Sequence, residues 1–338
     1  MKKGIKAILE WIGAFLIAFV ILNCVCFIYY KPSAWITRKD GVTDGVRRPY
    51  SITVMGTEGY GVTKLDANGF ANDNKPLIEN GYVLAMGAFH TQGKEVGSGK
   101  KYTDILNDYI IGNENEQLAV YNVASDANYL PSLIKRFAAG IEEFPNASTV
   151  ILEIGSTNYE EALIKDSLEQ VRYNENETAE ALFSNCDIFT KLKKNGKEYI
   201  PLYALMQKNM RALNKEEKIT IDVKYDTDEY SELMDCAMKL IRSEYDGNIL
   251  FVYHPKVEIC ENGALVCNRD ETVKTFKKIC EDNNIFFVDT GDAFIEHYAE
   301  TCEVPYGFSN TTMGTGHLNE TGHKILANVI YEELRRIN

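Results

Sequence analysis

The chain has 338 residues, of which 45% are hydrophobic and 25% charged, and this composition indicates folded domains rather than extensive disorder. Its formal net charge is −13 and no run of Lys and Arg forms a basic face, so the sequence predicts no binding to nucleic acid. The cysteines and histidines match no zinc-binding spacing, and we expect neither a metal nor another cofactor.

The first 30 residues predict a short cytoplasmic tail followed by a membrane anchor. From Trp11 to Tyr30 the sequence is apolar, with Asn23 as its one strongly polar residue. Twenty helical residues span roughly 30 Å, the thickness of a hydrocarbon core. The run is too long for the apolar part of a signal peptide and has no small-residue cleavage site. The alternative to a membrane anchor is a helix buried in the core of the protein. Preceding lysines favour an inside N-terminus, although basic residues also follow the run, and we expect a single-pass cell-membrane protein with an extracytoplasmic C-terminal domain.

Residues 31–80 are rich in Gly, Asp, Asn and Thr and are expected to form a stalk that leads into the main domain. In residues 81–338 apolar runs alternate with helical patterns. Five runs predict buried strands: "GYVLAMGAF", "QLAVYNVAS", "STVILEIGSTN", "NILFVYHP" and "IFFVDTGDAF". Their alternation with helices predicts an α/β three-layer sandwich around a five-stranded parallel sheet of the flavodoxin-like type. A helical insertion, a candidate lid, is expected at about 159–246.

Three segments are expected at the carboxyl ends of the strands, where ligands bind in such sheets. "MGAFH" ends the first strand, "EIGSTN" ends the third, and "GHLNETGH" precedes the last helix. In this order they resemble the SGNH hydrolases, also called the GDSL family, over roughly residues 80–335. That family carries Gly-Asp-Ser or Gly-Ser-Ser after strand one, Gly-x-Asn after strand three, and Asp-x-x-His before the C-terminal helix. The resemblance implies an esterase or O-acyl transferase that acts on an acylated small molecule or glycan, such as acyl esters of a cell-surface polysaccharide.

The resemblance also implies roles for individual residues. His317 would be the general base, and Asn158 would donate to the oxyanion, with Gly155 beside it. The backbone N–H of Phe89 would be a second oxyanion donor, and Gly87 and His90 would lie on either side of it at the binding site. Simpler interpretations remain for several of these residues: His317 as a helix cap, Asn158 as a turn or N-cap residue, and His90 as a structural histidine.

Two positions depart from the family pattern. Phe89 stands where the serine nucleophile is expected, and Gly314 replaces the aspartate three residues before His317. A backbone carbonyl could still orient the imidazole, but acyl transfer through the enzyme has no attacking atom without the serine. Thr91 and Ser125 are the nearby hydroxyls, and Thr91 is expected to point elsewhere. The alternative function is therefore a catalytically inactive SGNH-fold protein that binds a ligand or scaffolds a protein partner in an envelope pathway.

Overall fold

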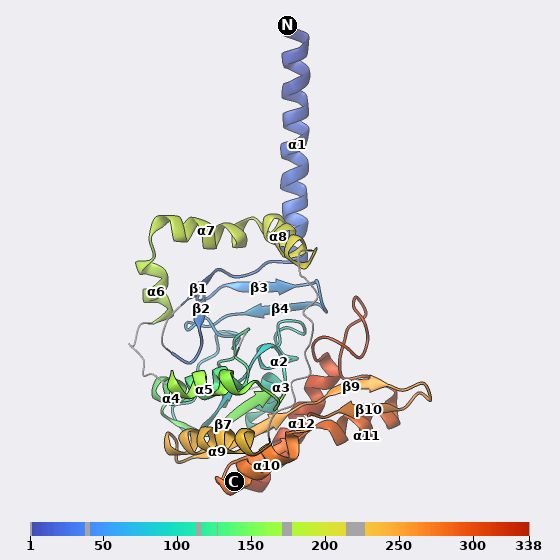
Figure 1. The fold of residues 1–338 in the computed structure, drawn as a ribbon. Coiled ribbons are helices and arrows are strands. Elements are labelled where there is room, and N and C mark those ends of the chain that lie inside the picture. Colours follow the sequence, from blue (N-terminus) through green and yellow to red (C-terminus); the bar gives the residue numbers. More distant parts are fainter. Residues whose placement is uncertain are drawn as a thin grey trace.

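The computed structural model describes residues 2–37, 41–112, 116–126, 128–170, 178–213 and 227–337. Helix α1 (Lys2–Tyr29) extends away from a body that contains the rest of the described chain (Figure 1). Its segment Gly4–Tyr29 has a mean hydropathy of 2.6 and is almost entirely exposed. Helix α1 is therefore a candidate membrane span, as predicted, although a signal sequence has the same length and composition.

The body is built on a five-stranded parallel sheet with the strand order β11-β8-β7-β5-β6. In chain order the strands are β5 (Tyr82–Met86), β6 (Val120–Asn122), β7 (Ala147–Ile154), β8 (Asn248–Tyr253) and β11 (Phe286–Asp289). Counted along the chain, the order is 2-1-3-4-5, which is the flavodoxin-like arrangement. The predicted strands and their parallel direction are confirmed. Every residue of β5 is buried, which explains its continuous apolar run.

Helices cover both faces of the sheet and complete three layers. One core cluster lies against α4 (Leu130–Glu143), α5 (Glu161–Glu169), α9 (Thr227–Ser243) and α10 (Val273–Asp282). The other lies against α3 (Tyr102–Ile111), α11 (Gly291–Thr301) and α12 (Glu320–Ile337). Each large apolar side chain buried in these clusters contributes about 1.5–3 kcal/mol relative to exposure. Together they hold the strand ends in fixed positions and so position the loops beyond them.

Residues 31–80 contain two antiparallel strand pairs. Strand β1 (Trp35–Thr37) pairs with β2 (Gly45–Arg47), and β3 (Ile52–Met55) pairs with β4 (Gly61–Lys64). The β3–β4 hairpin lies directly against the loop after α2 (Phe89–Gln92), because a Cβ on Gly61 would come within 2.0 Å of the Lys94 carbonyl oxygen. A domain boundary at residue 80 stays a prediction, but this hairpin contributes a residue to the site described below.

The segment between β7 and β8 is mainly helical within its described residues. Helices α5 and α9 pack on the sheet, whereas α8 (Pro201–Leu213) lies at the base of α1, α7 (Ile188–Tyr199) extends from α8 to one side, and α6 (Ala179–Asn185) lies beyond α7 (Figure 1). Asp187 caps α7 by accepting a hydrogen bond from the Thr190 N–H at 2.9 Å, and Pro201 occupies the start of α8. After β8, β9 (Lys256–Ile259) and β10 (Leu265–Asn268) form an antiparallel hairpin.

Candidate active site

A cavity of about 450 Å³ lies at the carboxyl ends of β5, β7 and β8. Its lining includes residues from all three of the sequence segments that carry the SGNH resemblance. Phe89 and His90 follow β5, Gly155 follows β7, and His317 precedes α12. Ligands of flavodoxin-like folds bind at this edge of the sheet. The fold therefore brings the three segments together at one candidate site.

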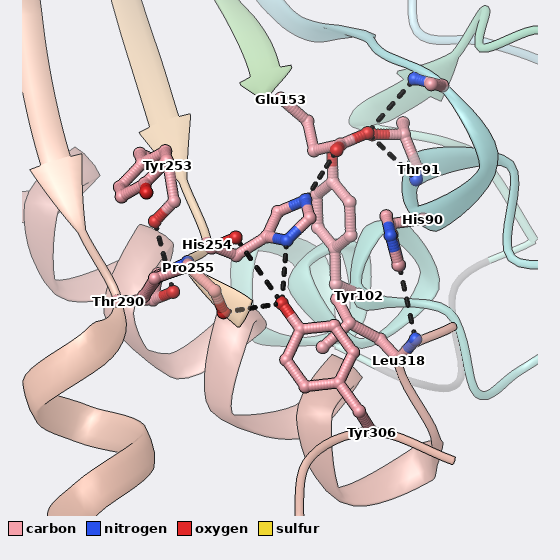
Figure 2. Close-up of polar contacts among 11 residues, drawn as sticks. His90, Thr91, Tyr102, Glu153, Tyr253, His254, Pro255, Thr290, Tyr306 and Leu318 are labelled. Atoms are coloured by element: carbon pink, nitrogen blue, oxygen red, sulfur yellow. Dashed lines mark hydrogen bonds and ion pairs between the residues drawn. The ribbon is translucent and has the colours of Figure 1, made fainter. Parts of the chain in front are cut away.

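The loop after β5 is fastened to the sheet by Glu153 of β7, whose side chain is 2% exposed. Its Oε2 accepts hydrogen bonds from the N–H groups of Ala88 at 3.0 Å and Thr91 at 3.3 Å, and from the Thr91 hydroxyl at 2.8 Å. These contacts are drawn in Figure 2. A Cβ on Gly87 would lie 2.5 Å from the same oxygen, so only glycine fits between β5 and this carboxylate. Gly87 thus belongs to the support of the site and has a packing role.

The second oxygen of Glu153 joins a polar chain that runs along the cavity wall. Oε1 lies 2.6 Å from Nε2 of His254, and Nδ1 of His254 lies 2.8 Å from the Tyr306 hydroxyl (Figure 2). Burial alone would raise the pKa of Glu153, but the hydrogen bond and charge of His254, together with the hydrogen bond from Thr91, lower it to about 2. Glu153 is therefore an ionised acceptor at neutral pH, and His254 Nε2 donates to it.

His317 is held by Glu58, a residue of the turn between β3 and β4. The backbone N–H of His317 donates to Oε1 of Glu58 at 2.9 Å, and its Nδ1 lies 2.8 Å from Oε2. Burial favours neutral His317, but Glu58 and the charge of Glu95 outweigh burial and raise the pKa of His317 above its usual 6.5. Burial likewise opposes ionisation of Glu58, yet contact with His317 lowers the Glu58 pKa. The Glu58 carboxylate thus faces Nδ1 of His317, where the aspartate of the family pattern would lie but Gly314 has no side chain.

The approach of Glu58 depends on the loop before α12. Gly316 has a φ of +80°, and a Cβ there would lie 2.3 Å from Oε1 of Glu58. A larger residue would therefore be strained and would push the carboxylate away from His317. Sequence reasoning missed Glu58 because it lies 259 positions before its partner and matches no motif of the resemblance.

Phe89 points its ring at the imidazole of His317. The two rings meet edge to face with their centroids 5.3 Å apart. The ring of Tyr129 lies 6.2 Å from that of Phe89, and the Lys94 ammonium lies 5.6 Å from the Phe89 centroid. The position where the resemblance expects a serine hydroxyl is therefore filled by a hydrocarbon ring that packs against the candidate base.

Neither nearby hydroxyl replaces the serine. Thr91 is fully buried, and its hydroxyl contacts Glu153 and the Tyr102 hydroxyl, the latter at 3.0 Å. Ser125 is 6% exposed and does not line the cavity. Ser156 does line the cavity, but its hydroxyl donates to Oδ2 of Asp270 at 2.7 Å. Within the described residues, the cavity therefore has no serine or threonine hydroxyl paired with His317.

The remaining predicted residues have different surroundings. Asn158 is exposed and does not line the cavity, and its N–H donates to the Ser156 hydroxyl at 3.1 Å. Nδ1 of His90 accepts from the Leu318 N–H at 3.2 Å, and the His90 ring lies 4.4 Å from that of His254 (Figure 2). Burial and the charge of His254 lower the pKa of His90 well below 6.5, so His90 is a neutral ring in the wall. The geometry thus brings Phe89, His90, Gly155 and His317 together and leaves Asn158 outside.

The flavodoxin-like sheet and the meeting of three motif segments at one cavity define an SGNH-hydrolase-like fold. No family model and no curated protein matches the chain. Three solved structures among those that match are an acetyl xylan esterase, an acetyl-xylooligosaccharide esterase from Geobacillus stearmophilus, and an alpha/beta hydrolase enzyme from the metagenome of Lake Arreo.

The acetyl xylan esterase is 11% identical, and the match covers 75% of this chain and 99% of the esterase with a TM-score of 0.43. The Geobacillus enzyme is 16% identical over 76% of this chain and 96% of its own, with a TM-score of 0.41. The Lake Arreo enzyme is 12% identical over 77% and 98%, also with a TM-score of 0.41.

Proposed function

We propose that the cavity is an SGNH-type site that binds an acyl ester, carried by a small molecule or a glycan, without forming an acyl-enzyme. The observation that carries this proposal is the ring of Phe89 against His317, at the position of the absent serine. A covalent acyl intermediate requires an attacking oxygen within reach of the base. A phenyl ring cannot supply that oxygen, whereas the aromatic lining that it shares with Tyr129 suits the apolar faces of a sugar or an acyl group.

The proposal places this site outside the cytoplasmic membrane, on a protein held there by α1. The length and hydropathy of α1 support an anchor, and the lysines before it favour an inside N-terminus. An inactive ester-binding site fixed to a membrane would present or protect an acylated envelope glycan, or would hold such a ligand for a catalytic protein partner.

The Glu58–His317 pair favours a second candidate, hydrolysis by water. With Nδ1 held by Glu58, Nε2 of His317 could take a proton from water while the resulting hydroxide attacks the ester carbonyl. The C–O bond of the ester then breaks, and the proton passes from the imidazole to the departing alcohol. Because Glu58 raises the pKa of His317, the neutral base would become available only above that raised pKa. Such turnover would increase with pH.

The test uses the full chain purified in detergent. We expect an acetylated glycan to bind in isothermal titration calorimetry, and no release of p-nitrophenol from p-nitrophenyl acetate above the buffer rate. Loss of the hydrogen-bonding imidazole in His317→Ala should weaken binding about tenfold. His297→Ala is the matched control, because His297 is a half-exposed histidine of α11 paired with Glu303 and does not line the cavity.

Two results decide between the candidates. Turnover by the native protein that His317→Ala abolishes and His297→Ala preserves would replace the binding proposal with water-based hydrolysis. Failure of acetylated glycans and simple acetyl esters to bind, with the protein folded, would contradict an acyl-ester site altogether.

A further inference from the structure

Helices α7 and α8 expose an unusually apolar face. The large side chains of this face are Ile188, Phe189 and Leu192 on α7, and Tyr203, Met206 and Met210 on α8. Their spacings of three and four residues place them on one side of each helix. Phe189 is 79% exposed and Leu192 66%. We name these six residues the α7–α8 face. Large apolar side chains exposed together on neighbouring helices mark a contact with a membrane or a partner.

The α7–α8 face points away from the body because the opposite side of α7 is fixed to it. Glu198 is fully buried, and its Oε1 lies 2.8 Å from the Arg48 guanidinium and 3.6 Å from the Lys31 ammonium. Along the helix, Glu198 is about 120° from Leu192, given 100° per residue. The body therefore holds α7 by its polar side and leaves its apolar side uncovered by any described residue.

The junction of α7 and α8 is also bonded to the candidate membrane span. Asn23, the polar residue within the apolar run of α1, accepts from the Leu202 N–H at 3.2 Å and donates to the Tyr199 carbonyl at 3.3 Å. Asn23 precedes the end of α1 at Tyr29 by six residues, a rise of about 9 Å. Figure 1 shows α8 beside the lower end of α1 and α7 extending to one side at that level, roughly perpendicular to α1. Surface-bound amphipathic helices place their apolar faces about 5–10 Å into the boundary of headgroups and acyl chains, which agrees with this level.

The charge of this segment fits an anionic surface. Residues 179–213 contain six basic and three acidic side chains, a net charge of +3, whereas the whole chain has a net charge of −13. Lys193 is exposed and lies about 100° around α7 from Leu192, at the edge of the apolar side, where its long side chain can reach the headgroups while the stem covers apolar surface. Anionic headgroups therefore complement this part of an otherwise acidic protein.

We infer that the α7–α8 face lies in the interface of the same bilayer that α1 crosses and binds anionic lipid there. This inference rests on the anchor role of α1 given under the proposed function, and it is independent of what the cavity binds. Two attachments, one spanning and one interfacial, would fix the orientation of the body on the membrane. Lys208 of α8 also donates to the hydroxyl of Thr57, the residue before Glu58, so the surface-bound helix contacts the loop that holds His317.

Depth-dependent fluorescence quenching of the full chain in vesicles tests the inference. The vesicles contain phosphatidylcholine brominated at shallow or deep acyl positions, with phosphatidylglycerol at about one third. Native Trp11, in a Trp35→Phe background, reports on α1. Phe189→Trp in a Trp11→Phe/Trp35→Phe background reports on the α7–α8 face. Ile259→Trp in the same double-Phe background is the matched control, because Ile259 is an exposed apolar residue, 43% exposed, on the β9–β10 hairpin.

We expect bromines at shallow positions to quench the Phe189→Trp probe at least twofold more than bromines at deep positions. Trp11 should be quenched, the Ile259→Trp probe should not be, and Leu192→Glu should reduce quenching at position 189. If the Phe189→Trp probe is not quenched while Trp11 in its own variant is quenched, the inference is overturned, and the α7–α8 face would instead be a contact for a protein partner. An unquenched Trp11 would overturn the anchor and the inference together, while binding of esters to the cavity would be unaffected.

Discussion

Replacing Glu153 with glutamine should destabilise the body by removing one buried negative charge while keeping the shape of the side chain. The carboxylate accepts three hydrogen bonds from the loop after β5 and one from His254. Its pKa falls from an ordinary 4.5 to about 2 in the folded protein. At 1.36 kcal/mol per pKa unit, this difference corresponds to about 3 kcal/mol of stability at neutral pH.

The same shift predicts how the loss depends on pH. The folded pKa of Glu153 lies below the unfolded value, so its contribution is complete above about pH 4.5 and disappears as the pH falls through about 2. The free energies of unfolding of the native protein and Glu153→Gln should therefore differ by about 3 kcal/mol at pH 7 and by about 1 kcal/mol at pH 3. Urea titrations of the full chain in detergent, followed by near-ultraviolet circular dichroism, measure both differences.

Glu160→Gln is the matched control, because Glu160 is an exposed carboxylate seven residues further along the chain. Exposed substitutions of this kind change stability by about 0.5 kcal/mol or less. A loss in Glu153→Gln as small as that of the control, or one that stays constant between pH 7 and pH 3, would refute the assignment of Glu153 as the ionised support of the loop.

Two further substitutions, examined in three measurements, test other contacts. Glu58→Gln should lower the pKa of His317 toward or below 6.5, which the ring signals of the histidine in an NMR pH titration would report. An unchanged titration would show that Glu58 does not raise the pKa of His317. The pKa of His317 is raised and that of Glu58 is lowered, so the pair should stabilise the fold by about 1 kcal/mol between about pH 4.5 and 6.5, and by less on either side. If Glu58→Gln loses the same stability at every pH, the two side chains do not interact as an ion pair. Glu198→Gln should weaken the contact of α7 with Arg48 and raise the rate of amide hydrogen exchange in α7 at least tenfold, while exchange in α12 stays unchanged. Equal exchange rates in α7 of the native protein and the variant would show that Glu198 does not hold α7.

The sheet could be predicted from the sequence because strands buried on both faces leave continuous apolar runs. The run that became β5 is buried at every residue, and β8 is buried at all but its first. The order of such strands follows from the alternation with helices, which allows few topologies. The position of the cavity followed in turn, because the carboxyl ends of parallel strands share one edge.

The partner of His317 could not be predicted in the same way. Glu58 belongs to a hairpin in a stretch interpreted as a stalk, and only tertiary packing brings it to the loop before α12. The asparagine of the Gly-x-Asn pattern has a different problem, since Asn158 stands one position later than that pattern requires and the turn leaves it exposed. Motif spacing fixes which residues follow a strand, and the hydrogen bonds of the turn decide which side chains enter the cavity.

Trapping of an acyl-enzyme tests the central claim most directly, namely that position 89 is the nucleophile position of an SGNH-type site and that Phe89 prevents covalent chemistry there. The native full chain, Phe89→Ser and Phe89→Ala would each be incubated with p-nitrophenyl acetate, and peptides covering residues 82–94 would be analysed by mass spectrometry. The account predicts an acetyl adduct at position 89 in Phe89→Ser alone, because only that variant places a hydroxyl beside His317. An adduct on the native protein, or none on a folded Phe89→Ser that still binds the ester, would contradict it.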